Sequence, residues 1–118
     1  MLFRMNVQRA NGVARVSLEG EMDMAAVDPF LRGLSEVEQE PGVEILVDLR
    51  GLTFLDSSGL HQLVELHERS LTAGRTVELV GTPDKLTKLF ELTSLGYLIT
   101  RQDDSRLLRQ FDRAEFAD

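Results

Sequence analysis

Residues 56–59, Asp-Ser-Ser-Gly, place a carboxylate and two hydroxyls between two apolar segments of the chain. Three kinds of chemistry suit such a group: capping of a helix N-terminus, nucleophilic catalysis by a serine, or acceptance of a phosphoryl group. A cap needs only one of these side chains, because a single oxygen satisfies an unpaired backbone N–H at the start of a helix. The local pattern taken alone favours capping, but it leaves a hydroxyl for another use. Gly59 in addition lets other backbone approach closely.

Catalysis by a serine is the alternative that the surrounding residues support least. His61 follows Ser57 by four residues, so the two side chains would be neighbours on a helix. However, Leu55 and Asp56 stand two residues before the two serines, where the nucleophile-elbow motif requires glycine. We therefore expect His61 on the surface, and His67, on the apolar side of the same helix, packed partly against the core. No catalytic residue is predicted, and we expect the protein not to be an enzyme.

A phosphorylated serine would change the charge of this part of the chain. Phosphorylation adds about −1.5 to −2 charges at pH 7, and a helix N-terminus tolerates such an anion. Asp56 already places a negative charge beside the serines. If a docked partner forces the phosphate and Asp56 together, their repulsion costs several kcal/mol of binding free energy, which changes the affinity by orders of magnitude. The stretch could therefore act as a switch for protein binding.

The composition limits the classes of protein to which the chain can belong. Its 118 residues suit one domain, 1–118, and 42% hydrophobic with 28% charged residues are typical of a soluble globular protein. The formal charge of −7 argues against nucleic acid as a partner, and the absence of cysteine excludes thiol chemistry. With two histidines and scattered carboxylates, we expect no metal and no cofactor. No apolar run reaches the roughly 18–20 residues of a membrane span and no signal sequence is evident, so we expect a cytoplasmic protein.

Apolar residues recur with two different periods along the chain. A period of two is typical of half-buried strands, and a spacing of three and four is typical of amphipathic helices. Asn11-Gly12 is a hairpin-turn signal between the first two strands. The expected strands are 3–7, 14–18, 43–49, 76–80 and 97–99; the expected helices are 27–37, 57–73, one that starts at Pro83, and 104–116.

This order of elements predicts the α/β class, with a mixed sheet of four to five strands and about four helices. The strands are not apolar throughout, as they would be in a sheet covered on both faces. We therefore expect the helices to pack mainly on one face, leaving the other largely open to water or a partner, with room for a homodimer. The residues expected on the open face are Arg4, Asn6, Arg15, Ser17, Glu19, Asp48, Thr76 and Glu78.

Three segments stand out as motifs: LEGEMD (18–23), VDLRGLTFLDSSGL (47–60) and TPDKLTKLFELTSL (82–95). In this order they resemble the hallmarks of STAS domains, specifically of the bacterial anti-sigma factor antagonists. The second segment is similar to the family signature, in which a strand leads into Asp-Ser-Ser/Thr-Gly-Leu at a helix start. The first resembles the Gly-Glu-aliphatic-Asp stretch and the last resembles the third helix. The resemblance covers nearly the whole chain and implies a single STAS domain.

The resemblance implies a role for each residue of these motifs. Ser57 aligns with the serine phosphorylated by an anti-sigma factor that is itself a serine kinase, and Ser58 is the secondary candidate. Asp23 aligns with an acid that family members need to engage the kinase; without the resemblance it would be interpreted as a turn or first-turn acid. The unphosphorylated protein would bind the anti-sigma factor and free sigma, the phosphorylated protein would let go, and a separate phosphatase would reset it. The implied partner-binding residues are Glu21, Asp23, Asp56, Ser57, Ser58, Gly59 and His61, with Glu21 and Met22 at the rim.

The chain departs from the family pattern at two places. His61 stands where family members often have glycine, one turn from Ser57 and inside the expected contact area. Thr93-Ser94-Leu95 replaces Thr-Gly-Leu, so Gly96 is expected to take up the turn after the third helix. The alternative function is that of a STAS scaffold or regulatory subunit without a phosphorylation switch, in a stress complex, a nucleotide-responsive module or a transport system.

Overall fold

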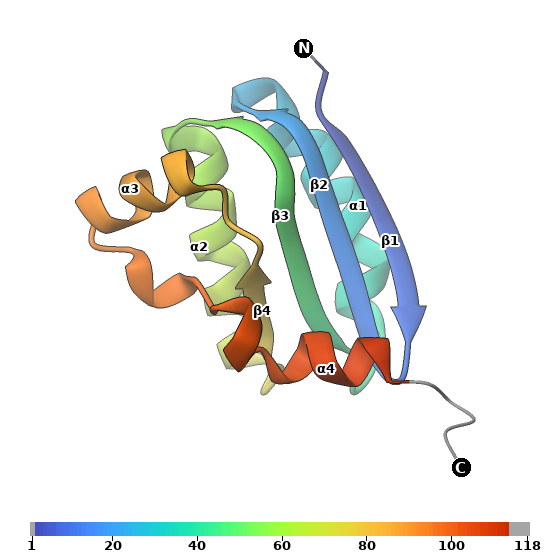
Figure 1. The fold of residues 1–118 in the computed structure, drawn as a ribbon. Coiled ribbons are helices and arrows are strands. Elements are labelled where there is room, and N and C mark those ends of the chain that lie inside the picture. Colours follow the sequence, from blue (N-terminus) through green and yellow to red (C-terminus); the bar gives the residue numbers. More distant parts are fainter. Residues whose placement is uncertain (1, 114–118) are drawn as a thin grey trace.

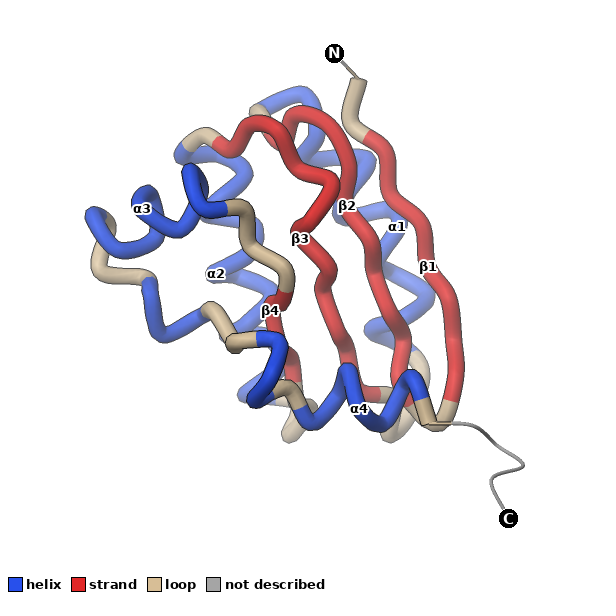
Figure 2. The backbone as a smooth tube through the Cα atoms, viewed as in Figure 1, coloured by secondary structure: helices blue, strands red, loops and turns tan. Residues whose placement is uncertain are grey.

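The computed structural model describes residues 2–113 of the chain and contains one sheet. Its strands are β1 (Arg4–Ala10), β2 (Val13–Met22), β3 (Glu44–Leu55) and β4 (Val77–Val80), arranged in the order β1-β2-β3-β4 (Figures 1 and 2). β1 and β2 are antiparallel, whereas β2–β3 and β3–β4 pair in parallel. The predicted mixed sheet of the α/β class is therefore confirmed.

A tight turn joins β1 to β2, as the sequence predicts. Asn11 and Gly12 have φ angles of 53° and 78°. A two-residue hairpin turn of this kind needs two successive positive φ values, which Asn and Gly adopt at the lowest cost. Asn11 Nδ2 also donates to the backbone carbonyls of Gln110 (2.9 Å) and Arg113 (2.8 Å). The turn thus holds the far end of the described chain against the hairpin.

Two long helices cover one face of the sheet. α1 (Val27–Gln39) and α2 (Ser57–Thr72) lie behind it in Figure 1, and α3 (Asp84–Leu92) follows β4. Their buried side chains pack with apolar residues of the sheet to form the main core, among them Phe30, Leu34, Leu63 and Phe90. Within residues 2–113, no helix combines the length and the apolar character needed to cross a bilayer.

A fourth helix lies on the opposite face of the sheet. α4 (Arg106–Asp112) crosses in front of the strands in Figure 1, and Leu107 packs with Val13, Leu46 and Val80 in a second, smaller core. Val13 and Leu46 lie near the amino ends of β2 and β3. The face that we expected to be largely open is therefore open only toward the carboxyl ends of these strands. The part of the predicted last helix beyond residue 113 lies outside the described residues.

The strand expected at 97–99 is wrong, because a short 3-10 helix, η2 (Gly96–Leu98), takes its place. Only Ile99 pairs with the sheet there, through a bridge parallel to Leu79, and Thr100 N donates to Leu79 O at 2.8 Å. Leu98 is buried and Tyr97 is exposed. One inward and one outward side chain fit a single 3-10 turn as well as they fit a strand, so the pattern could not separate the two.

The turn after α3 is made by a serine rather than by the glycine that we expected. Ser94 has a φ of 61°, in the left-handed region, whereas Gly96 does not have a positive φ. Leu95 N donates to Phe90 O at 2.7 Å, which closes the helix end. Left-handed backbone is costly for a residue with a β-carbon, so the turn carries local strain.

A buried carboxylate organises the polar face of the sheet. Asp48 in β3 is 5% exposed and accepts hydrogen bonds from Nη2 of Arg15 (2.7 Å) and Nη2 of Arg50 (2.8 Å). The Arg15 guanidinium also lies over the ring of Phe111 in α4, 5.5 Å from its centroid. Burial alone would raise the pKa of Asp48, but the hydrogen bonds from Arg50 and Arg15 outweigh it and hold this pKa below its usual value.

Candidate functional site

The carboxyl ends of β2 and β3 run side by side and place two aspartates at the same edge of the sheet. In the parallel register Met22 pairs with Leu55, and Asp56 N donates to Met22 O at 3.4 Å. Asp23 and Asp56 are the next residues of the two strands. This edge lies at the top of Figure 1, at the other end of the sheet from α4. The structure therefore brings together two segments that are more than thirty residues apart in the sequence.

Asp56 is the N-cap of α2. Its backbone is extended, with φ −106° and ψ −173°, and its Oδ1 accepts a hydrogen bond from Gly59 N at 3.0 Å. Ser57 is the first residue of the helix and is exposed, and Ser58 is half-buried. The capping role that the sequence indicated thus belongs to the carboxylate. The Ser57 hydroxyl is on the surface and is not the cap of this helix.

Gly59 seats the first turn of α2 against the ends of both strands. A β-carbon on this residue would lie 2.2 Å from Met22 O and 2.8 Å from Leu55 Cδ1. Such contacts are far shorter than van der Waals separation, so the position has room only for glycine. Gly59 is buried, and it supports the site from beneath instead of presenting a side chain to a partner.

Asp23 repeats the geometry of Asp56 on the neighbouring strand. It is the N-cap of the short 3-10 helix η1 (Met24–Ala26), and its Oδ1 accepts from Ala25 N at 3.0 Å. The turn role that the sequence alone suggested is therefore present. Its place in the register also brings it to the same edge as Asp56, so both half-buried aspartates lie at the edge of the sheet where α2 begins with the exposed Ser57.

The two rim residues named from the sequence differ in exposure. Glu21 lies opposite Phe54 in the β2–β3 register and is half-buried. Met22 is fully buried and belongs to the main core, so its expected place at the rim is wrong. Its inward side chain follows from strand alternation, which turns neighbouring residues to opposite faces.

The two histidines of α2 lie at different depths, as expected. His61 is on the surface, and its Nε2 is 3.1 Å from Oε1 of Glu65, one turn further along the helix. His67 is half-buried, and its ring meets that of Tyr97 edge-on with centroids 5.7 Å apart. Within residues 2–113 no group of three or more His, Cys, Asp or Glu side chains is arranged to hold a metal ion.

Two exposed apolar side chains next to the acidic pair were missed by the sequence reasoning. Met24, directly after Asp23, is 75% exposed, and Phe54, two residues before Asp56, is 45% exposed. Large apolar groups on the surface beside a charged site are typical of protein-binding surfaces. The local signal was weak, because Phe54 stands in an apolar strand where a buried side chain is the ordinary expectation.

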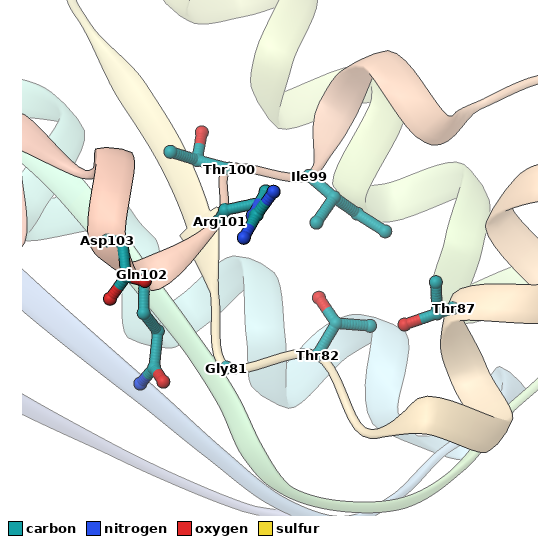
Figure 3. Close-up of a pocket in the computed structure, with 8 residues that line it drawn as sticks. All are labelled: Gly81, Thr82, Thr87, Ile99, Thr100, Arg101, Gln102 and Asp103. Atoms are coloured by element: carbon teal, nitrogen blue, oxygen red, sulfur yellow. The ribbon is translucent and has the colours of Figure 1, made fainter.

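A hollow of about 370 Å³ at the carboxyl end of β4 lies apart from these residues. Figure 3 shows threonines around it, Thr82, Thr87 and Thr100, together with Arg101 and Asp103. None of the predicted site residues lines this hollow, and its lining has neither a histidine nor a cysteine.

Comparison with protein families shows what kind of domain carries this arrangement. The family model described as "Mlab, STAS domain" matches residues 5–100, which is most of the chain. The chain belongs to the STAS domain family. In this STAS domain the Asp-Ser-Ser-Gly stretch consists of the N-cap and the first turn of α2, directly after β3.

Curated relatives of this STAS domain include antagonists of anti-sigma factors. The anti-sigma-B factor antagonist of Staphylococcus aureus (strain NCTC 8325) is 28% identical over 84 residues, covering 71% of this chain and 78% of the relative. The anti-sigma-B factor antagonist of Bacillus subtilis is 25% identical over 99 residues, covering 84% of this chain and 90% of the relative.

Solved structures share the fold of this STAS domain. An anti-sigma factor antagonist from Mycobacterium paratuberculosis has a TM-score of 0.78 at 23% identity, covering 95% of this chain and 96% of that one. The antagonist SpoIIAA in its unphosphorylated form has a TM-score of 0.75 at 18% identity, with coverages of 91% and 95%. Bacillus SpoIIAA in the phosphorylated form has a TM-score of 0.66 at 20% identity, with coverages of 83% and 90%. At these identities the likeness establishes the fold.

Proposed function

We propose that this STAS domain is an anti-sigma factor antagonist whose binding is switched off by phosphorylation of Ser57. The unphosphorylated protein binds an anti-sigma factor that is a serine kinase, and so releases the sigma factor. The observation that carries the proposal is that the helix cap and the exposed hydroxyl at the start of α2 belong to different residues. Asp56 caps the helix, and the exposed Ser57 hydroxyl can be modified without removing a contact on which the helix depends.

The names of the relatives support the same function. Two curated relatives are anti-sigma-B factor antagonists, and SpoIIAA is an anti-sigma factor antagonist that has been solved with and without a phosphoryl group. The fold alone would not decide the matter, because one fold can carry several functions. The decisive support is the combination of these names with an exposed serine in the Asp-Ser-Ser-Gly stretch.

The transfer step needs a nucleoside triphosphate held by the partner kinase. The Ser57 oxygen attacks the γ-phosphorus, the bond to the nucleoside diphosphate breaks, and the hydroxyl proton leaves to a base of the kinase. This chain is the substrate and supplies no catalytic residue. Reset requires a separate phosphatase that hydrolyses the phosphate ester.

The physical effect of the phosphate is local repulsion. It adds about −1.5 to −2 charges at pH 7 beside the carboxylates of Asp23 and Asp56. The positive end of the α2 dipole stabilises this charge within the domain, so the fold is retained. A partner that covers the modified site forces the phosphate and the two carboxylates together away from water, and this repulsion costs several kcal/mol of binding free energy.

The surface around Ser57 indicates the kind of partner surface that it fits. Acidic groups at Asp23 and Asp56 lie next to the exposed apolar side chains of Met24 and Phe54. The complementary surface on the anti-sigma factor would offer an apolar pocket for these two side chains. Ser58 and Glu21, which are half-buried, lie at the margin of this contact. We place this exchange in the cytoplasm, and the partly open sheet face leaves room for a homodimer.

A pair of serine variants tests the acceptor. Ser57→Ala should bind the kinase-type anti-sigma factor as the wild type does and gain no phosphate in the presence of ATP. Ser58→Ala is the matched control and should gain one phosphate at the wild-type rate, as followed by intact-protein mass spectrometry. Phosphorylation of Ser57→Ala at the wild-type rate would show that the acceptor is another residue.

A further inference from the structure

We propose that His61 holds the phosphate once Ser57 has been phosphorylated, by turning from Glu65 to the phosphoryl oxygens. The inference rests on the proposed phosphorylation of Ser57 and adds a positioning residue to that switch.

The spacing along α2 puts three polar side chains in one row. Ser57, His61 and Glu65 stand at i, i+4 and i+8, so each lies about one turn, or roughly 6 Å of helix rise, from the next. The Cα–Cβ bonds of a helix tilt toward its N-terminus. A rotation of the His61 side chain away from Glu65 can therefore bring its imidazole over the turn that carries Ser57.

The present contact of His61 leaves its ring free to change partners. Its Nε2 is 3.1 Å from Glu65 Oε1, and the side chains are 64% and 45% exposed. An exposed polar contact of this kind contributes little free energy and exchanges readily with water. Rotation about the side-chain bonds of His61 toward Ser57 requires no rearrangement of the core.

The phosphate is the stronger acceptor of the two. It offers three oxygens and about −1.5 to −2 charges, compared with a single negative charge on Glu65. The charged groups that adjoining elements bring to this end of α2 are Asp23, at the junction of β2 and η1, and Asp56, at the end of β3. A cation between these carboxylates and the phosphate relieves repulsion among the anions.

The contact has a consequence for the switch. A phosphate bonded to imidazolium prefers its dianionic form, so it carries its full charge at a lower pH than a free phosphoserine does. It is also fixed over the first turn of α2. With glycine at position 61 the phosphate would depend on the helix N-terminus alone.

Titration of a phosphate installed without any kinase tests the contact. Phosphoserine is incorporated at position 57 during synthesis, and the ³¹P chemical shift is followed from about pH 4 to pH 8, which brackets the second phosphate ionisation near 6. The same titration is run on His61→Gln and on His67→Gln. His67 is the matched control, because it lies on the same helix but ten residues from Ser57.

The expected result is a ³¹P titration midpoint about 0.5 pH unit lower in the wild type than in His61→Gln, the size expected of an exposed charge contact. The midpoint of His67→Gln should match the wild type. Glu65→Gln should keep the low midpoint or lower it further, since it removes the competing acceptor. An equal midpoint in the wild type and His61→Gln, or a higher one in the wild type, would overturn the proposal.

This test is independent of the proposed function on which the inference rests. If the kinase fails to phosphorylate Ser57, the proposed function fails, but the titration of the installed phosphoserine still reports on His61. If the titration shows no effect of His61, the contact is refuted and the phosphorylation of Ser57 is unaffected. Far-UV circular dichroism of each variant confirms that α2 is intact, as expected for an exposed residue.

Discussion

Asp23 and Asp56 are helix N-caps that follow directly on a pair of residues matched across two parallel strands. Each accepts a backbone N–H through Oδ1 at 3.0 Å, Asp23 from Ala25 and Asp56 from Gly59. The pairing of Met22 with Leu55 puts the two caps at one edge of the sheet. Because the carboxylates do the capping, the neighbouring exposed residues Ser57 and Met24 are left for contacts outside the domain.

The apolar pair Met24 and Phe54 should contribute to partner binding and not to stability. Truncation of either to alanine removes an exposed side chain, so the free energy of unfolding should change by no more than about 0.5 kcal/mol. The affinity for the kinase-type anti-sigma factor should fall about tenfold or more, as measured by calorimetric titration. Leu71→Ala is the control, since Leu71 is 65% exposed near the far end of α2. Unchanged affinity in both test variants would remove them from the docking surface.

Gly59→Ala should destabilise the domain strongly. The new methyl group would have to lie 2.2 Å from Met22 O, a backbone atom that cannot move without shifting β2. We expect a loss of about 2–4 kcal/mol in the free energy of unfolding, measured by urea denaturation. Gly96→Ala is the matched control, because a β-carbon there meets no atom within 4 Å, and it should change stability by less than about 0.5 kcal/mol. Similar stabilities of the two variants would mean that α2 does not sit against β2 as described.

Asp48→Asn should destabilise the domain at neutral pH and much less in acid. The change leaves the Arg15 guanidinium, only 15% exposed, without its carboxylate, at a cost of about 2–3 kcal/mol. The pKa of Asp48 is lowered in the folded protein, so its contribution is fully present above the unfolded value near 3.9 and is lost as the pH falls through the folded value. The difference between wild type and variant in urea denaturation should therefore shrink below about pH 4.

The control for Asp48 is an ion pair on the open surface. Arg4 and Glu19 are 3.1 Å apart with side chains 78% and 54% exposed, so Glu19→Gln should cost less than about 0.5 kcal/mol at neutral pH. An equally small loss in Asp48→Asn, or a loss that does not depend on pH, would contradict the role given to the buried carboxylate.

Ser94→Gly should stabilise the domain. Ser94 has a φ of 61°, and the left-handed conformation costs a residue with a β-carbon about 1–2 kcal/mol, a cost that glycine avoids. Glycine makes the unfolded chain more flexible, which offsets about 0.5–1 kcal/mol of this gain in stability. We expect a net gain of about 0.5–1 kcal/mol in thermal or urea unfolding. Ser94→Ala keeps the β-carbon and should not gain stability, which separates the backbone effect from loss of the hydroxyl. A destabilised Ser94→Gly would show that the serine side chain holds the turn.

Local sequence signals predicted the parts of the fold that depend on neighbouring residues. The Asn11-Gly12 turn, the start of α2 at Ser57 and the partial burial of His67 all follow from short-range rules and are confirmed. The order of elements predicted a mixed sheet, but the pairing of β2 with β3, which brings Asp23 and Asp56 to one edge, was not predicted. No local pattern contains it, because the two residues are distant in sequence.

The features that the sequence reasoning missed depend on tertiary contacts. The apolar residues of α4 predict a helix but not the face on which it packs, and Leu46 in β3 turned out to be its partner. Ser94 takes a left-handed conformation, against the preference of serine, because the chain turns there so that Leu95 N can donate to Phe90 O at the end of α3. The exposure of Phe54 reflects where the strand leaves the core, which its apolar character hides.

The affinity of the kinase-type anti-sigma factor should be measured for the protein with unmodified Ser57 and for the protein carrying phosphoserine at this position. We expect an affinity about a hundredfold lower for the phosphorylated form, equivalent to about 3 kcal/mol, with an unchanged far-UV circular dichroism spectrum. Equal affinities would contradict the switch. Loss of the helical signal on phosphorylation would contradict the claim that Asp56, and not Ser57, holds the start of α2.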